Sequence, residues 1–172
     1  METAALIVAA GMSSRMGSFK PMLNIGSISV AQRVIANFRQ AGINKIVMIT
    51  GFNATMLERH LAGNNIIFLR NENYESTQMF DSVKIGLNYL SDKCERLLFT
   101  PVDVPLFTSQ TVKKLLSSGA KLACPVCNDL TGHPLLISKE LFPTILADSG
   151  DGGLKGAVDR CGAELVQISV DD

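Results

Sequence analysis

The chain has 172 residues, of which 47% are hydrophobic and 19% charged, and its 16 basic residues balance its 16 acidic ones. This balance excludes the basic field that draws a protein to nucleic acid or an anionic membrane, and no apolar run approaches the ~20 residues that cross a bilayer. We therefore expect one domain over residues 1–172, free-standing or part of a longer chain, that binds a small molecule and neither nucleic acid nor membrane. Because residues 1–4 lack the basic flank of a secretory signal, we expect a cytoplasmic location.

The first predicted element is a buried strand at residues 6–10, an apolar run that ends at Gly11. The loop that follows has glycines, whose backbone amides can approach an anion closely, and side chains that add donors and positive charge. These loop residues are Gly11, Ser13, Ser14, Arg15, Gly17 and Lys20. A strand followed by such a loop predicts a binding site for a phosphate chain.

Two common phosphate-binding loops do not fit this segment. A Walker loop needs Lys directly after its second glycine, whereas Gly17 and Lys20 are not adjacent. A dinucleotide fingerprint needs three glycines that open a helix, whereas this loop has two and is followed by Pro21. The glycine spacing therefore disfavours a nicotinamide-dependent oxidoreductase.

Strand-like runs and helix-like periods alternate along the rest of the chain, which predicts an α/β domain with three layers, doubly wound and Rossmann-like, around a mostly parallel sheet. The further strands are expected at 45–50, 66–69, 97–100, 122–126 and 164–170, with an extended segment at 134–137. The helices are expected at 30–41, from 53 or 55 to about 61, at 80–90, from a cap at Thr108 or Ser109 to 116, and near 139–146 and 154–160. We find no internal repeat.

The four cysteines include one Cys-x-x-Cys segment, Cys124 to Cys127. A zinc site needs a second Cys or His pair at ligand spacing, and a redox motif opens a helix after a strand. Neither feature is present, and residues three apart on a strand face opposite sides. We expect two reduced cysteines at the end of a strand.

Asp103 follows the predicted strand at 97–100 and lies between two prolines. Because parallel strands end at the same edge of a sheet, this loop and the loop at 11–20 should open onto one crevice. A carboxylate on a restricted backbone suits a ligand of Mg²⁺, which prefers oxygen donors. Asp103 is therefore the candidate metal ligand, in preference to a helix cap.

These blocks resemble the nucleotidyltransferases that attach a nucleotide to molybdopterin, within the sugar-nucleotide pyrophosphorylase-like superfamily. The matching segments are Ala9-Ala10-Gly11, Ser14-Arg15-Met16-Gly17, Lys20-Pro21-Met22-Leu23, Asp103-Val104-Pro105 and Gly132-His133-Pro134. The resemblance implies the nucleotidyltransferase fold, a nucleoside triphosphate donor and Mg²⁺ on Asp103. The last segment is similar to the cytidylyltransferase branch, and the guanylyl branch usually has Gly where Ala10 stands, so CTP is favoured.

The resemblance also implies roles for individual residues. The expected catalytic residues are Arg15, Lys20 and Asp103. The expected nucleotide-binding residues are Ala9, Ala10, Gly11, Ser13, Ser14, Arg15, Gly17, Lys20, Asn71 and Ser82. His133 and Asp151 are candidates for the acceptor side. Asn71, Ser82, His133 and the glycine-rich loop around Asp151 are also compatible with purely structural roles as turn or helix-start residues.

The predicted function is transfer of CMP from CTP to a phosphate-bearing acceptor, molybdopterin, with release of pyrophosphate, in molybdenum cofactor maturation. Two alternatives stay open: a sugar 1-phosphate acceptor, and a nucleotide-binding module of a larger protein without catalysis. The family commonly ends in an acidic segment that gives a second metal ligand, whereas this sequence ends at Val170-Asp171-Asp172. We therefore expect a longer chain, a second ligand from elsewhere, or none.

Overall fold

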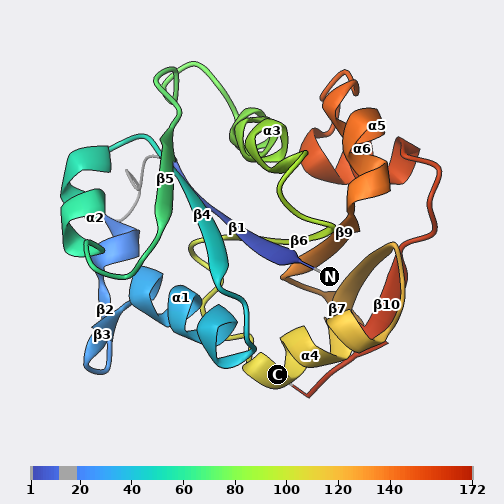
Figure 1. Cartoon of the computed structure of the whole chain (residues 1–172), viewed down its shortest axis with the longest axis horizontal. Coiled ribbons are helices and arrows are strands. Elements are labelled where there is room, and N and C mark those ends of the chain that lie inside the picture. The colour runs from blue at the N-terminus through green and yellow to red at the C-terminus, as the bar shows by residue number, and fades with distance from the viewer. Residues whose placement is uncertain (1, 12–18, 172) are drawn as a thin grey trace.

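A computed structural model describes residues 2–11 and 19–171 of the chain. One central sheet is covered by helices on both faces, which gives three layers (Figure 1). One face carries α1 (Val30–Gln40), α2 (Ala54–His60) and α4 (Ser109–Ser117). The other carries α3 (Met79–Leu90), α5 (Phe142–Leu146) and α6 (Gly153–Arg160). The predicted three-layer α/β class is therefore confirmed.

Strand β1 (Thr3–Ala9) lies inside the main sheet, paired in parallel with β4 (Lys45–Thr50) and β6 (Arg96–Pro101). The strand order is β10-β7-β9-β6-β1-β4-β5, with β8 paired to β7. The other strands are β5 (Ile67–Arg70), β7 (Leu122–Cys127), β8 (Leu130–Thr131), β9 (Leu135–Ser138) and β10 (Val166–Ser169). Only β8 and β9 run antiparallel to their neighbours among the described strands of this sheet, so the prediction of a mostly parallel sheet is confirmed.

The core has two halves that meet at the sheet, and β1 contributes to both. Leu6 and Val8 pack with α3, α5 and α6, whereas Ile7 and Ala9 pack with α1, α2 and α4. A strand buried on both faces needs apolar side chains in both directions, which explains the continuous run in the sequence. The end of β1 is consequently held in place from both sides of the sheet.

Helices α1 and α4 begin at Ser and Thr side-chain caps. The N–H of Gln32 donates to Ser29 Oγ at 3.2 Å, and the N–H of Ser29 donates to Gln32 Oε1 at 2.9 Å, which forms a capping box at the start of α1. The N–H of Thr111 donates to Thr108 Oγ1 at 3.3 Å, so Thr108 is the cap of α4. One of the two predicted candidates is thus correct.

The structure differs from the predicted elements in the segment after Lys20, where none was predicted. A 3-10 turn, η2 (Lys20–Met22), is followed by a hairpin of β2 (Asn24–Ile25) and β3 (Ile28–Ser29). These strands have two residues each, too short for a periodic pattern. The predicted helix at 139–146 also divides into η3 (Lys139–Leu141) and α5, with Pro143 in the first turn of α5.

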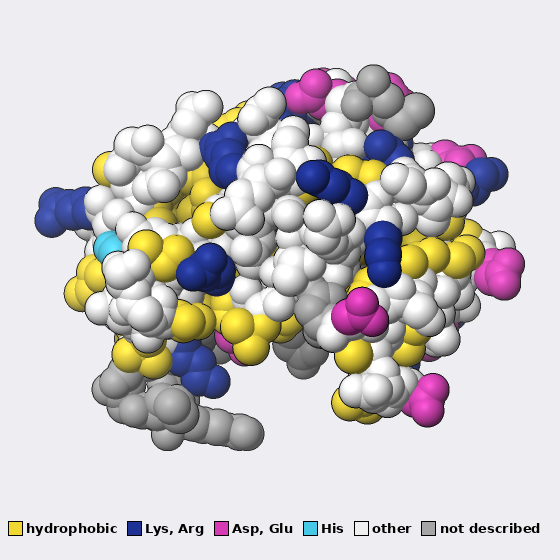
Figure 2. Space-filling view, turned by 90° about the horizontal axis from the view of Figure 1, so that it is seen from below, with side chains coloured by type: hydrophobic (Ala, Val, Ile, Leu, Met, Phe, Trp, Pro, Cys, Tyr) yellow, Lys and Arg dark blue, Asp and Glu magenta, His cyan; other side chains and the backbone are white. Residues whose placement is uncertain are grey.

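Basic, acidic and hydrophobic side chains are interspersed on the face that carries α1 and α4 (Figure 2). Within residues 2–11 and 19–171, every helix is too short or too polar to cross a membrane.

Candidate functional site

The candidate site lies where β1 and β6 end at the same edge of the sheet. The two strands pair up to Val8 and Pro101, and the N–H of Val102 then donates to the carbonyl oxygen of Val8 at 3.0 Å. The chain segments that leave these strands therefore start side by side. Both line one cavity, to which the end of β1 and the segment after it contribute residues 8–11, and the end of β6 and the segment after it contribute residues 101–103.

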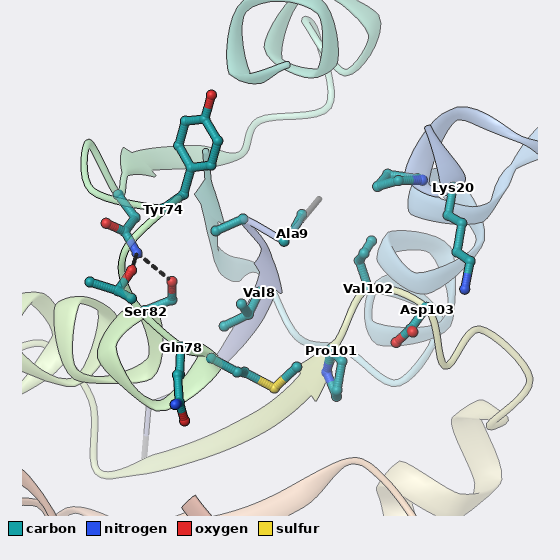
Figure 3. A pocket seen from close by; sticks show the side chains of 15 residues that line it. Val8, Ala9, Lys20, Tyr74, Gln78, Ser82, Pro101, Val102 and Asp103 are labelled. Atoms are coloured by element: carbon teal, nitrogen blue, oxygen red, sulfur yellow. Dashed lines mark hydrogen bonds between the residues drawn. The ribbon is translucent and has the colours of Figure 1, made fainter. Parts of the chain in front are cut away.

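The cavity has two chemically different sides (Figure 3). Lys20 and Asp103 lie on one side, so a cation and a carboxylate share the same cavity. Tyr74, Gln78 and Ser82 lie on the other side and offer a ring and uncharged hydrogen-bonding groups. Such an arrangement suits a ligand with one highly charged end and one neutral, polar end.

Lys20 is held at the cavity by the 3-10 turn that it begins. The N–H of Leu23 donates to the carbonyl oxygen of Lys20 at 3.0 Å, and the N–H of Met22 donates to that of Phe19 at 3.1 Å. Pro21, which has a fixed φ and no N–H to satisfy, is buried in this turn. The backbone of Lys20 is therefore fixed.

Asp103 is exposed, but the loop that carries it is tied to α1. The side-chain amide of Asn37 donates to the carbonyl oxygen of Pro105 at 2.8 Å. The rings of Phe107 and Phe38 pack with centroids 5.1 Å apart. These two contacts anchor the loop that follows Asp103 in the sequence. The carboxylate of Asp103 is therefore exposed to solvent on a fixed backbone.

Asn71 and Ser82 both line the cavity, but the polar atoms of Asn71 are engaged within the protein. Its Nδ2 donates to Thr77 Oγ1 at 2.9 Å and to Ser82 Oγ at 3.0 Å, and its Oδ1 accepts the N–H of Asn73 at 3.0 Å. Asn71 is only 5% exposed. Asn71 therefore shapes the loop over residues 71–78, whereas the hydroxyl of Ser82 keeps its own proton to donate.

The residues present fit a metal that takes most of its ligands from a substrate. No group of three or more His, Cys, Asp or Glu side chains suited to a metal ion occurs in the described part of the chain. Asp103 is the only carboxylate among the described residues that line the cavity. Mg²⁺ is commonly held by one or two carboxylates together with phosphate oxygens and water. Asp103 would therefore hold such an ion only together with a phosphate-bearing ligand.

His133 lies in an adjacent cavity, which it lines together with Leu106, Phe107 and Leu130. Its ring meets that of Phe99 edge-on, with centroids 5.8 Å apart. Burial lowers the pKa of His133, and the negative charge of Asp103 opposes this shift. The imidazole is thus outside the main cavity yet within electrostatic reach of the carboxylate.

Asp151 is exposed and is not among the residues that line the main cavity. Its carbonyl oxygen accepts a hydrogen bond from Arg160 at 2.7 Å, which gives this loop a structural role.

Of the predicted site residues, the structure brings together Ala9, Ala10, Gly11, Lys20, Asn71, Ser82 and Asp103. Ser13, Ser14, Arg15 and Gly17 lie outside the described residues.

Sequence reasoning missed Tyr74, Thr77 and Gln78, which also line the cavity. They belong to the polar loop between β5 and α3, at the same edge of the sheet as Gly11 and Asp103. The rule that places the loops after β1 and β6 at this edge applies equally to the loop after β5, and it was the available signal.

Sequence comparison identifies the family. The family described as "MobA-like NTP transferase domain" matches residues 5–165. The molybdenum cofactor cytidylyltransferase of Escherichia coli K12 is 33% identical over 138 residues, which cover 78% of this chain and 69% of that protein. The bifunctional protein GlmU of Staphylococcus haemolyticus is 31% identical over 118 residues, which cover 67% of this chain but 26% of GlmU.

Solved structures share the fold. Rv0371c from Mycobacterium tuberculosis H37Rv superposes with a TM-score of 0.85 and 20% identity, over 100% of this chain and 89% of that one. A second structure of Rv0371c, in complex with manganese, gives a TM-score of 0.84 at 19% identity, over 100% of this chain and 90% of that one. Together with the family match over most of its length, these findings show that the chain belongs to the MobA-like NTP transferase family and is a nucleotidyltransferase.

Proposed function

We propose that this protein transfers CMP from CTP to a terminal phosphate of molybdopterin, with Mg²⁺ and with release of pyrophosphate. The observation that carries the proposal is that Lys20 and Asp103, a cation and a carboxylate, line one cavity at the edge of the sheet. The choice of CTP and molybdopterin is supported by the similarity to the E. coli cytidylyltransferase and by the segments around Ala10 and His133.

In the proposed reaction, an oxygen of the acceptor phosphate attacks the α-phosphorus of the triphosphate. A new P–O bond forms, the bond from the α-phosphorus to its bridging oxygen breaks, and pyrophosphate leaves. The attacking oxygen is already anionic and needs no general base. The protein must therefore align the two phosphate groups and offset the repulsion between them.

The charged side of the cavity is suited to this task. Lys20 would contact the phosphates, and Arg15 and the backbone amides of the loop that begins at Gly11 would add further donors. Asp103 would hold Mg²⁺ together with phosphate oxygens and water. When bound, Mg²⁺ supplies positive charge that stabilises the crowded phosphates.

The uncharged side would receive the nucleoside. The hydroxyl of Ser82 and the amide of Gln78 can hydrogen-bond a base or ribose, and Tyr74 offers an aromatic surface at the same side of the cavity. These groups are compatible with more than one base, so the preference for CTP is best tested directly.

The test is a panel of CTP, GTP, ATP and UTP, each with Mg²⁺ and with molybdopterin, a sugar 1-phosphate or no acceptor, measured as pyrophosphate release. We expect the fastest release with CTP and molybdopterin. Release only with a sugar 1-phosphate would favour the alternative acceptor. Binding of CTP without release, with every acceptor, would favour a module without catalysis.

Variants of the charged side test the assigned roles. Lys20→Ala and Arg15→Ala should each lower turnover on the order of 10²–10³-fold, the usual loss for one donor to the transition state. Lys113→Ala, on the exposed surface of α4, is the matched control for loss of a positive charge. Unchanged turnover in a folded Lys20→Ala or Arg15→Ala variant would remove that residue from the mechanism.

A further inference from the structure

A row of three aromatic rings runs between the two sides of the cavity. The ring centroid of Phe52 is 6.0 Å from that of Phe19 and 6.2 Å from that of Tyr74, and both contacts are edge-on. Phe19 directly precedes Lys20, which lines the charged side, and Tyr74 lines the uncharged side. Phe52 is not one of the described residues that line the cavity, so it links Phe19 to Tyr74 without lining the cavity itself.

The backbone next to Phe52 is also closely packed between two parts of the cavity wall. A Cβ atom at Gly51 would lie 2.8 Å from the carbonyl oxygen of Ala10 and 2.8 Å from the Cβ of Tyr74. Ala10 and Tyr74 both line the cavity. The N–H of Phe52 donates to the same carbonyl oxygen of Ala10 at 3.4 Å. Only glycine allows the chain to pass between these two groups without moving one of them.

We propose that Gly51 and Phe52 are positioning residues that set the separation between the Lys20 side and the Tyr74 side of the nucleotide site. This inference rests on the proposed function of the cavity. Edge-on ring contacts are directional, so the row fixes the turn at Phe19 relative to the loop at Tyr74. A nucleotide that must contact both sides at once depends on that separation, because small errors in alignment weaken binding and slow the reaction.

A merely structural role would give a different result. If Phe52 only filled space, its loss would lower the melting temperature and leave nucleotide affinity unchanged in the folded protein. The comparison therefore uses Phe52→Ala, Phe52→Leu, which keeps most of the apolar volume, and Gly51→Ala. Leu116→Ala is the control, since Leu116 is half-buried in the core on α4 and does not line the cavity.

The first measurement is the dissociation constant of CTP with Mg²⁺ at a temperature where every variant is folded. We expect about tenfold weaker binding for Phe52→Ala, a smaller loss for Phe52→Leu and a loss of about tenfold or more for Gly51→Ala. Leu116→Ala should bind CTP as the wild type does, although its melting temperature falls. Wild-type affinity in folded Phe52→Ala and Gly51→Ala would overturn the inference.

A second measurement needs no nucleotide and keeps the inference separate from the proposed function. The chain has no Trp and two Tyr, so in a Tyr89→Phe background the tyrosine fluorescence reports Tyr74 alone. Phe52→Ala should make the Tyr74 side chain more accessible to quenching by acrylamide. Phe19→Ala should do the same, because loss of the Phe19 ring loosens Phe52, which contacts Tyr74. Unchanged quenching in Phe19→Ala would overturn the inference. If the wild type bound no nucleotide while quenching rose as expected, the proposed function would fail and the coupling of the two sides would stand.

Discussion

The side-chain amide of Asn37 donates a hydrogen bond to the carbonyl oxygen of Pro105 at 2.8 Å, which joins helix α1 to the loop that carries Asp103. Asn37 is 6% exposed and lies 68 residues from Pro105 in the sequence. A buried amide is expensive to leave without a partner, so this contact holds the helix and the loop together. The site thus depends on a residue that does not line it.

Replacement of Asn37 should therefore reduce stability and activity together. Asn37→Ala removes the donor to Pro105 and leaves its partly buried carbonyl oxygen without that hydrogen bond, which should lower the free energy of unfolding by about 1 kcal/mol. Turnover should fall as well, because the loop at Asp103 loses an anchor. Urea denaturation and pyrophosphate release measure the two effects. Asn88→Ala, exposed on α3, is the control and should change neither.

Asp103 should behave in the opposite way, with a large loss of activity and little loss of stability. Its side chain is exposed, so Asp103→Asn keeps the shape of the loop and removes only the charge offered to Mg²⁺. We expect turnover to fall on the order of 10²–10³-fold with an unchanged melting temperature. A Mg²⁺ titration of pyrophosphate release should require more metal in the variant. A variant with wild-type turnover and metal requirement would show that Asp103 does not hold the metal.

The edge of the sheet that carries the site could be predicted from the sequence. Strand β4 was predicted with the bounds that the structure has, Lys45–Thr50, because a strand buried on both faces is a continuous apolar run. The convergence of residues 9–11 with Asp103 then followed from the direction of parallel strands. The first prediction depends on periodicity, which local sequence carries, and the second depends on the parallel sheet that alternating strands and helices indicate.

The reversal of β9 and the role of Asn71 could not be predicted in the same way. The alternation of apolar side chains is the same whichever direction a strand runs, so β9 gave no sign that it is antiparallel to β6 and β7. An Asn in a polar loop has the same pattern whether its amide faces a ligand or its own loop. The hydrogen bonds from Asn71 to Thr77 and Ser82 could be seen only in the structure.

The ion pair of Asp148 and Arg160 should make stability depend on acid pH. The guanidinium of Arg160 donates to both carboxylate oxygens, at 2.9 and 2.6 Å, and holds the pKa of Asp148 at about 2, below the usual 3.8. The unfolded chain therefore binds more protons between these values, so the stabilisation is present above about pH 4 and is lost as the pH falls through about 2.

Asp148→Asn removes this titrating group. The variant should be less stable than the wild type at pH 7, and its stability should fall less steeply between about pH 4 and pH 2. Urea midpoints over pH 2–7 measure both effects, with Asp159→Asn, exposed on α6, as the control. Parallel acid profiles for the wild type and Asp148→Asn would contradict the assigned ion pair.

Two of the four cysteines should react slowly with a thiol reagent and the other two should react fast. Burial raises the pKa of Cys94 to about 11 and also raises that of Cys124, so the reactive thiolate is disfavoured at both. Cys127 and Cys161 are half-buried. An aromatic disulfide reagent at pH 8 should therefore modify Cys127 and Cys161 in the native protein, and the other two only after unfolding. Cys127→Ser should remove one fast thiol and leave Cys124 slow.

A zinc or redox pair would give a different result, because Cys124 and Cys127 would then react together or be protected together. Separate reaction rates at these two positions would therefore decide against a zinc or redox function for the Cys-x-x-Cys segment.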